Sequence, residues 1–308
     1  ACNFYMPIFE EALDAYGLPL ELKYLPIIES ALNPSAVSRA GASGLWQFMI
    51  GTGKIYGLES NSLIDERRDP IKATWAAARY LKEMYDIYGD WNLVIAAYNC
   101  GPGTINKAIR RANGETDYWK IYNYLPKETR GYVPAFIAAN YVMTYYCDHN
   151  ICPMETNIPA STDTVQVNKN LHFEQIADLC NVPLDQIKSL NPQYKKQMIP
   201  GDSKPYTLRL PIDAISTFID KQDTIYTHRA DELFRNRKTV AVKDITPATR
   251  KTTSAVAGKG NLTYYTIKSG DTLSTIARKY GVTIKDIQRW NGMSSTKIAA
   301  GKRLKIYK

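Results

Sequence analysis

Apolar residues between positions 6 and 147 recur at the three- and four-residue spacing of helices that bury one face. Capping signals mark helix ends, and the clearest are Asp69-Pro70 before one long apolar pattern and Gly89 after it. We expect helices at positions 7–17, 19–30, 71–88, 91–98, 104–112, 117–124 and 127–146. Because little strand pattern lies between them, the sequence predicts a mainly α domain over residues 1–158.

The pattern changes after residue 160, where strand-like edges flank helical centres in two regions, 161–212 and 262–308. An internal repeat relates the two regions. The recurring residues are Ile176-Ala177, Val182, Ile187, Asn191 and Gly201 in the first copy, and Ile276-Ala277, Val282, Ile287, Asn291 and Gly301 in the second. Each copy is predicted to run strand, helix, helix, strand. The expected fold class is therefore α+β, a mainly α domain followed by two small βααβ modules at 159–212 and 262–308.

The segment at 213–261 separates the two modules and is predicted to have two parts. Residues 214–234 fit a helical or a strand-like extension. Residues 235–260 are rich in Lys, Arg, Thr, Ala and Gly and carry little apolar pattern. Such a composition indicates a flexible, basic linker.

Charge is distributed unevenly along the 308 residues. Residues 1–158 hold 14 Lys and Arg against 17 Asp and Glu, a net charge of −3, and the remainder holds 25 basic and 13 acidic residues, a net charge of +12. A basic C-terminal half suits nucleic acid, an anionic membrane or an anionic wall polymer, and it also suits a solvated linker. No nucleic-acid motif accompanies it, so no nucleic-acid partner is expected.

No apolar run reaches the ~18 residues needed to span a membrane. The chain begins at Ala1 with no charged and apolar leader, so we expect that a signal peptide was removed or the chain truncated. Cys2 leaves membrane association through a lipidated N-terminus as an alternative. Cys147 and Cys152 flank a short polar turn and could pair in an oxidising compartment. With three histidines and no dense Asp cluster, the sequence predicts no metal site and no cofactor.

The stretch at 28–49 is the most informative one for function. Its carboxylate, Glu29, ends the apolar run Leu25-Pro26-Ile27-Ile28. A carboxyl group set against apolar surface tends to have a raised pKa, because desolvation disfavours its charged form. A general acid that works near neutral pH needs such a pKa. The small residues at 35–44 would let an extended polymer lie close to the backbone. Without further evidence, Glu29 could also be a solvent-exposed residue at the end of a helix.

Three sequence blocks, in this order, change that reading of Glu29. The first holds Glu29-Ser30, Asn33-Pro34, Ser38, Gly41-Ala42 and Gly44-Leu45-Trp46-Gln47, the second is Ala96-Ala97-Tyr98-Asn99-Cys100-Gly101-Pro102-Gly103, and the third is Glu128-Thr129-Arg130-Gly131-Tyr132-Val133. Together they resemble the signature of the lytic transglycosylases that have a goose-type lysozyme fold. The one departure is Cys100, where that family more commonly has Ala.

The resemblance implies cleavage of the β-1,4 bond between N-acetylmuramic acid and N-acetylglucosamine in peptidoglycan. Typical glycosidases use two carboxylates, whereas the motif region here offers one. By resemblance, Glu29 first protonates the leaving oxygen and then takes a proton from the C6 hydroxyl of the substrate. The attack of that hydroxyl closes a 1,6-anhydro ring and consumes no water, and proximity makes it efficient.

The same resemblance implies substrate-binding residues. Ser38 and Gln47 are expected to hydrogen-bond the polar substituents of the sugar. Asn99 and Tyr132 are expected to position the saccharide beside the acid, with Tyr98 packed under the site. Tyr98 and Tyr132 also fit roles in the core, and Gln47 and Asn99 also fit ordinary caps or loop contacts.

The region 262–308 closely resembles the LysM module, a βααβ fold that binds glycans containing N-acetylglucosamine. The residues implied to line its groove are Gly270, Asp271, Thr272, Ile298 and Gly301. A plain turn at 270–271 is the alternative. The copy at 161–212 is degenerate, because 170–172 lacks the Gly-Asp-Thr sequence and a longer tail at 193–204 replaces the compact turn. Its fold is therefore expected more firmly than its glycan affinity.

These interpretations predict a monomeric peptidoglycan lytic transglycosylase whose LysM modules hold it on wall glycan strands. The expected compartment is the periplasm or the outer-membrane-associated cell envelope. Two alternatives stay open. A goose-type lysozyme would hydrolyse the same bond with a second carboxylate, for which Asp65, Glu66 and Asp69 are candidates. A non-catalytic scaffold would only bind the wall.

Overall fold

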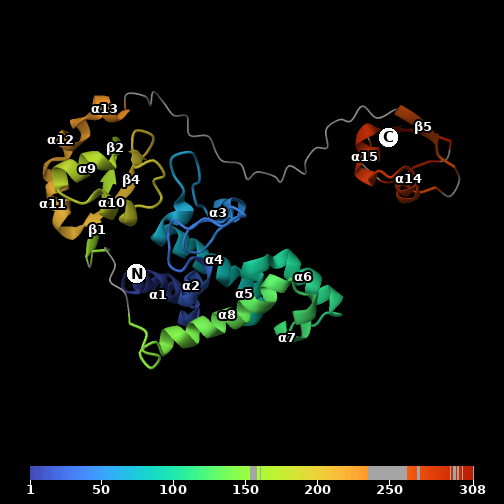
Figure 1. Ribbon diagram of the computed structural model, residues 1–308, viewed down its shortest axis with the longest axis horizontal. Helices are drawn as coiled ribbons and strands as arrows, with labels where there is room; N and C mark the ends of the chain where they lie inside the picture. The colour runs from blue at the N-terminus through green and yellow to red at the C-terminus, as the bar shows by residue number, and fades with distance from the viewer. Residues whose placement is uncertain are drawn as a thin grey trace. The chain divides into compact units, whose positions relative to one another are not determined.

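Helices build the N-terminal region of the computed structural model (Figure 1). Residues 1–152, 158–159, 161–234, 262–268, 271–291, 293, 296, 298–299 and 301–307 are described. The elements of the first region are α1 (Cys2–Ala15), η1 (Leu20–Tyr24), α2 (Leu25–Ser30), α3 (Ile50–Ile55), η2 (Glu66–Arg68), α4 (Pro70–Tyr88), α5 (Trp91–Cys100), α6 (Pro102–Arg111), α7 (Tyr118–Ile121), η3 (Tyr122–Tyr124) and α8 (Lys127–Thr144).

Local sequence signals account for many of these ends. The Asp69 side chain accepts hydrogen bonds from the backbone N–H groups of Ile71 and Lys72, and α4 ends at Gly89, where φ is 63°. Asp90 caps α5 in the same way through the N–H of Leu93. Asp69 and Gly89 are at the predicted positions, and Asp90 directly precedes the helix expected at 91–98.

Other helix boundaries differ from the prediction. The expected helix at 19–30 is divided into η1 and α2, because Pro26 has no N–H to donate and is accommodated only in the first turn of a new helix. Helix α1 begins before Pro7, since Tyr5 belongs to the same buried stripe as Phe9, Ala12 and Leu13. Helix α3 was not predicted.

The centre of this region is α5. Its residues from Leu93 to Ala97 are all buried, and it packs against α4, α6 and α8. A helix that is apolar on every side is buried on every side. Tyr98 and Asn99, at the C-terminal end of α5, are therefore held by a helix that is buried in the domain.

The first βααβ module follows. Its elements are β1 (Thr162–Val167), β2 (Asn170–His172), α9 (Phe173–Cys180), α10 (Leu184–Leu190), β3 (Met198–Pro200) and β4 (Tyr206–Pro211). Strands β1 and β4 pair antiparallel, and so do β2 and β3. The β2–β3 pair lies in the part of the copy where the sequence is degenerate. Residues 212–234 are helical, as α11 (Ile212–Asp220), α12 (Gln222–Thr227) and α13 (Ala230–Phe234).

The second module, 262–308, belongs to a different compact unit from the helical domain and the first module. It holds β5 (Leu262–Thr266), α14 (Leu273–Tyr280), α15 (Ile284–Trp290) and β6 (Arg303–Tyr307), with β5 and β6 antiparallel. Its core is its own, built around Tyr265, Ile276, Ile287 and Ile306. The predicted linker at 235–260 lies outside the described residues.

One asparagine per module makes the same contacts. Asn191 Nδ2 donates to the carbonyls of Ile187 and Arg209, and its Oδ1 accepts from the N–H of Arg209. Asn291 makes the same three bonds with Ile287 and Lys305. This side chain ties the end of the second helix to the last strand in both modules, which gives a physical reason for that part of the sequence repeat.

The predicted α+β class is confirmed, with a mainly α domain followed by small βααβ modules. Among the described residues, no helix combines the length and the apolar character that crossing a bilayer requires. Cys147 and Cys152 are exposed and carry free thiols.

Candidate active site

Glu29 lies in the last turn of α2, and the chain leaves that helix in an unusual conformation. Ala31 and Leu32 both have positive φ, 50° and 60°, which turns the backbone sharply after the helix. The Ser30 hydroxyl lies 2.9 Å from the carbonyl oxygens of Pro26 and Leu45. The end of α2 is thereby fixed against the segment 36–48, called here the 36–48 loop.

The Glu29 carboxyl is partly buried and receives a hydrogen bond from the Tyr132 hydroxyl of α8. Burial raises the pKa of Glu29 to about 7, the hydrogen bond from Tyr132 opposes this shift, and the negative charge of Glu128 adds to it. A carboxyl group with such a raised pKa can donate a proton near neutral pH, and its carboxylate can accept one.

Tyr98 and Asn99 come from the end of α5. The Tyr98 hydroxyl donates to the carbonyl oxygen of Trp46 at 2.7 Å, which ties α5 to the 36–48 loop. Burial, followed by the nearby charge of Glu29, raises the pKa of Tyr98 well above its usual value, so the phenol stays neutral. Asn99 Oδ1 accepts from the Thr129 hydroxyl of α8 at 2.9 Å.

The 36–48 loop carries the other two predicted residues. Gln47 has φ 48°, and its Nε2 donates to the carbonyls of Gly44 at 2.8 Å and Ala36 at 3.3 Å. Ser38 is exposed, and its hydroxyl accepts from the N–H of Ala42. Both side chains hold the shape of the loop in this structure.

A depression of about 250 Å³ joins part of this set. Its lining residues come from the 36–48 loop, α3, α4 and α5, and they are Gln47, Phe48, Met49, Thr52, Tyr80, Tyr98, Asn99, Cys100 and Gly101. The structure therefore brings Gln47, Tyr98 and Asn99 to one wall. Glu29 and Tyr132 do not line this depression, but they meet close to Tyr98, because the charge of Glu29 contributes to the raised pKa of Tyr98. Ser38 lies at the exposed tip of the loop.

Sequence reasoning missed Arg67, which is 5% exposed. Its Nε and one terminal nitrogen donate to the two oxygens of Asp65 at 2.8 Å, and its other terminal nitrogen donates to the carbonyls of Gly41 and Phe48 at 2.9 Å. The signal that could have found it is the Asp-x-Arg spacing directly after the apolar pair Leu63-Ile64.

The three carboxylates considered for a water-activating role all have structural partners. Asp65 pairs with Arg67. Glu66 accepts from Lys72 Nζ and from the N–H of Glu59, and Asp69 caps α4. Within the described ranges, no group of three or more His, Cys, Asp and Glu side chains could hold a metal ion.

The predicted groove residues of the second module are only partly described. Gly270 lies outside the described residues. Asp271 accepts from the N–H of Lys268 and the Tyr265 hydroxyl, both at 2.8 Å, and these two bonds lower its pKa. Thr272 hydrogen-bonds Thr275, and Gly301 has φ 87°. Ile298 lines a depression of about 430 Å³ next to β6.

Comparison with protein families defines the class. Residues 6–121 match the transglycosylase SLT domain, residues 161–227 match the LysM-like domain of lytic transglycosylase MltD, and residues 265–306 match the LysM domain. The chain is therefore an SLT-domain protein with LysM-type modules, as the sequence blocks predicted.

Individual relatives are more specific. The chain is 33% identical over 294 residues to membrane-bound lytic murein transglycosylase D of Escherichia coli (strain K12), covering 94% of this chain and 60% of that protein. It is 33% identical over 124 residues to the soluble lytic murein transglycosylase of the same strain, covering 38% of this chain and 19% of that one. The crystal structure of the 70 kDa soluble lytic transglycosylase from Escherichia coli matches with a TM-score of 0.40 and 29% identity, over 46% of this chain and 24% of that chain.

Proposed function

We propose that this chain is a peptidoglycan lytic transglycosylase that cleaves the β-1,4 bond between N-acetylmuramic acid and N-acetylglucosamine and leaves a 1,6-anhydro-muramic end. The carrying observation is the partly buried Glu29, whose pKa is about 7 beside Tyr132. The chain spans 60% of the length of the curated relative, and the activity is inferred from the part present here.

In the proposed reaction the protonated Glu29 gives its proton to the glycosidic oxygen as the bond to the muramic C1 breaks. The resulting carboxylate then accepts the proton of the muramic C6 hydroxyl. That oxygen bonds to C1, the anhydro ring closes, and Glu29 is protonated again, so no water is consumed. Tyr132 supports the carboxylate in the interval, because its hydrogen bond favours the charged form.

The other predicted residues act in binding. Gln47, Tyr98 and Asn99 share one depression, where amide and phenol groups suit the acetamido and hydroxyl groups of a sugar. Ser38 is accessible at the tip of the 36–48 loop and would contact the strand there. In the second module, an N-acetylglucosamine unit would bind at the depression that Ile298 lines. Asp271, Thr272 and Gly301 do not line this depression, and we propose them as further contacts of the same glycan.

The proposed setting is the cell envelope, where wall glycan strands lie. The first relative named above is called membrane-bound, and the periplasm is the compartment that we propose for this chain. A separate LysM module keeps the enzyme on its polymer and raises the local concentration of cleavable bonds.

Digestion of purified peptidoglycan with wild type and Glu29→Gln, followed by mass analysis of the fragments, tests the reaction. We expect fragments lighter by one water than hydrolytic products, and none from the variant. Reducing muramic ends from the wild type would show hydrolysis instead. Wall binding without any product would show a scaffold.

A further inference from the structure

The first module is joined to the catalytic domain by a backbone contact. Residues 63–65 form an antiparallel bridge with 193–195, in which the N–H of Asp65 donates to the carbonyl of Gln193 and the N–H of Lys195 donates to the carbonyl of Leu63. The segment 193–195 belongs to the long tail that distinguishes this module from the second one. The tail therefore has a binding partner inside the chain.

The loop that it meets, residues 59–66, is embedded in the module. Leu63 and Ile64, 2% and 0% exposed, belong to the core of the module and not to the core of the helical domain. Glu59 at the start of the loop pairs with Lys204 at 2.8 Å and accepts from the Tyr206 hydroxyl. Burial of these two aliphatic side chains in the module stabilises the contact.

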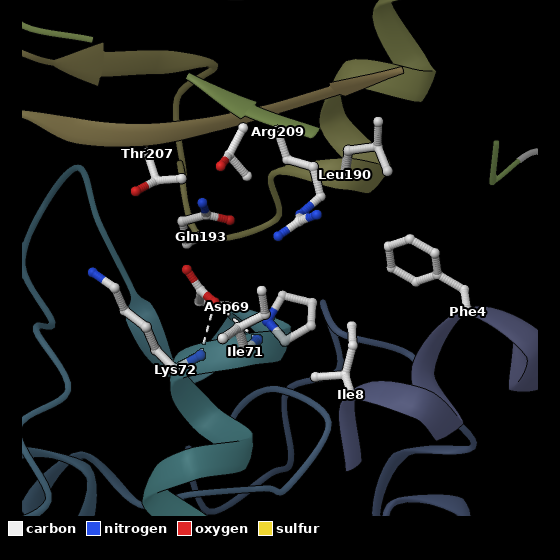
Figure 2. A pocket seen from close by; sticks show the side chains of 11 residues that line it. Phe4, Ile8, Asp69, Ile71, Lys72, Leu190, Gln193, Thr207 and Arg209 are labelled. Atoms are coloured by element: carbon white, nitrogen blue, oxygen red, sulfur yellow. Dashed lines mark hydrogen bonds between the residues drawn. The ribbon is translucent and has the colours of Figure 1, made fainter. Parts of the chain in front are cut away.

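A cavity of about 180 Å³ also lies between the module and the helical domain. In Figure 2, Leu190, Gln193, Thr207 and Arg209 of the module face Phe4, Ile8 and the start of α4. Among the described residues, the backbone pairing and the shared apolar core between the two parts come from the 59–66 loop.

Asp65 lies between Lys195 of the module and Arg67 of the helical domain. It is 1% exposed, and its Oδ2 lies 3.8 Å from Lys195 Nζ of the module, which also donates to the carbonyl of Asn61. The same carboxylate takes both hydrogen bonds from Arg67. Burial alone would raise the pKa of Asp65, but Arg67 and then Lys195 lower it, so the carboxylate stays charged between two cations.

Arg67 then fixes the 36–48 loop. Its bonds to the carbonyls of Gly41 and Phe48 connect the tip of the loop to its end, next to Gln47. Gly44, at φ 88°, lies so close that a Cβ there would be 1.7 Å from the Arg67 carbonyl oxygen. The guanidinium is planar and presents its donors in a rigid fork, which suits one carboxylate and two carbonyls at once.

We propose that the LysM-like module at 161–212 is a positioning element of the active site, and that Lys195, Asp65 and Arg67 transmit its position to the 36–48 loop. The inference rests on the proposed function, since it assigns that loop to glycan binding. Lys195 is then a positioning residue. A change there alters catalysis on substrates too short to reach a second binding surface.

Three substitutions of Lys195 test this proposal in the full chain. Lys195→Gln keeps a donor for the Asn61 carbonyl but removes the charge, Lys195→Met removes both, and Lys195→Arg keeps both. Lys188→Met, on the exposed face of α10 of the same module, is the matched control. The substrate is a short soluble glycan fragment, and hydrogen exchange of residues 41–48 is followed in parallel.

We expect Lys195→Gln to raise KM about fivefold through a misplaced loop, with the pH dependence of kcat unchanged because Glu29 is untouched. Exchange at 41–48 should become faster, Lys195→Arg should restore most of both, and Lys188→Met should match wild type. Wild-type KM and exchange in Lys195→Gln would overturn the proposal. Faster exchange over the whole domain would also overturn it, since that marks general destabilisation.

The two hypotheses fail in different ways. Reducing ends from the wild type would refute the transglycosylase reaction and leave the comparison of KM and exchange intact. If the wild type shows no cleavage at all, the hydrogen-exchange rates of residues 41–48 in the Lys195 variants still decide whether Lys195 positions the loop.

Discussion

The modules at 161–212 and 262–308 are held together by the same asparagine contacts but differ in what their cores contain. In the first, the tail before the last strand forms β3 and pairs with the 59–66 loop of the helical domain, so two core residues of the module come from outside it. In the second, the corresponding turn is short and the core is built from its own residues. The first module therefore shares its core with a loop of the helical domain, whereas the second module builds its core alone. The length of one turn is a visible difference between them.

Removing the acid should give the largest effect, because it separates the chemistry of the first unit from the binding of the second. Glu29→Gln is expected to lower cleavage about 10³-fold, the range for loss of a general acid, with unchanged sedimentation on wall sacculi. Glu21→Gln, an exposed glutamate in η1, is the control. Full activity in Glu29→Gln would show that another group is the proton donor.

Deleting 262–308 tests the independence of the second module. Loss of a tethered binding site should weaken sacculus binding about 10- to 100-fold, while turnover of short soluble fragments stays at the wild-type level. Sedimentation and fragment assays on one preparation give both numbers. Equal sacculus binding with and without the module would contradict its targeting role.

The pH dependence should also distinguish the two units. Glu29 has a pKa raised to about 7, and its protonated form starts the reaction, so kcat/KM should fall about tenfold per pH unit above 7. Binding of 262–308 to sacculi does not involve this group and should show no such break. A kcat/KM that rises between pH 7 and 9 would be inconsistent with Glu29 as the acid.

The smallest expected effect is on stability, and it can be measured with the same substitution in each module. Asn191→Ala and Asn291→Ala each remove the same three hydrogen bonds, at a cost of about 2 kcal/mol. Loss of Asn191 should destabilise the unit that also holds Glu29, and loss of Asn291 should affect only the second unit. Calorimetry of both variants checks this. A single shared transition shifted equally by both would show that the units are coupled.

Much of the fold follows from local patterns. The Asp69 cap, the helices expected at 71–88 and 91–98, and the strand, helix, helix, strand order of the second module are confirmed, because each depends on residues close together in sequence. The first module keeps this order and adds the strand pair β2 and β3. The family resemblance is confirmed as well. The roles of Glu29, Tyr132 and the other site residues stay predictions, supported by their contacts.

The sequence could not reveal which core Leu63 and Ile64 fill. Two apolar residues in a polar loop look the same whether they pack on their own domain or on one that begins a hundred residues later. The Arg67 contacts were hidden for the same reason, since the carbonyls it binds carry no sequence signal. The short β2–β3 pair is likewise decided by the tail that folds back on it.

The 59–66 loop also sets where the chain can be cut. A protein ending at residue 158 would expose the apolar side chains of Leu63 and Ile64 to water. Glu59 would also lose its partners Lys204 and Tyr206. Such a fragment would tend to aggregate even if its catalytic helices were intact. The shortest stable form of this protein should therefore extend through α13, and a domain boundary drawn at 121 or 158 is a poor guide for engineering it.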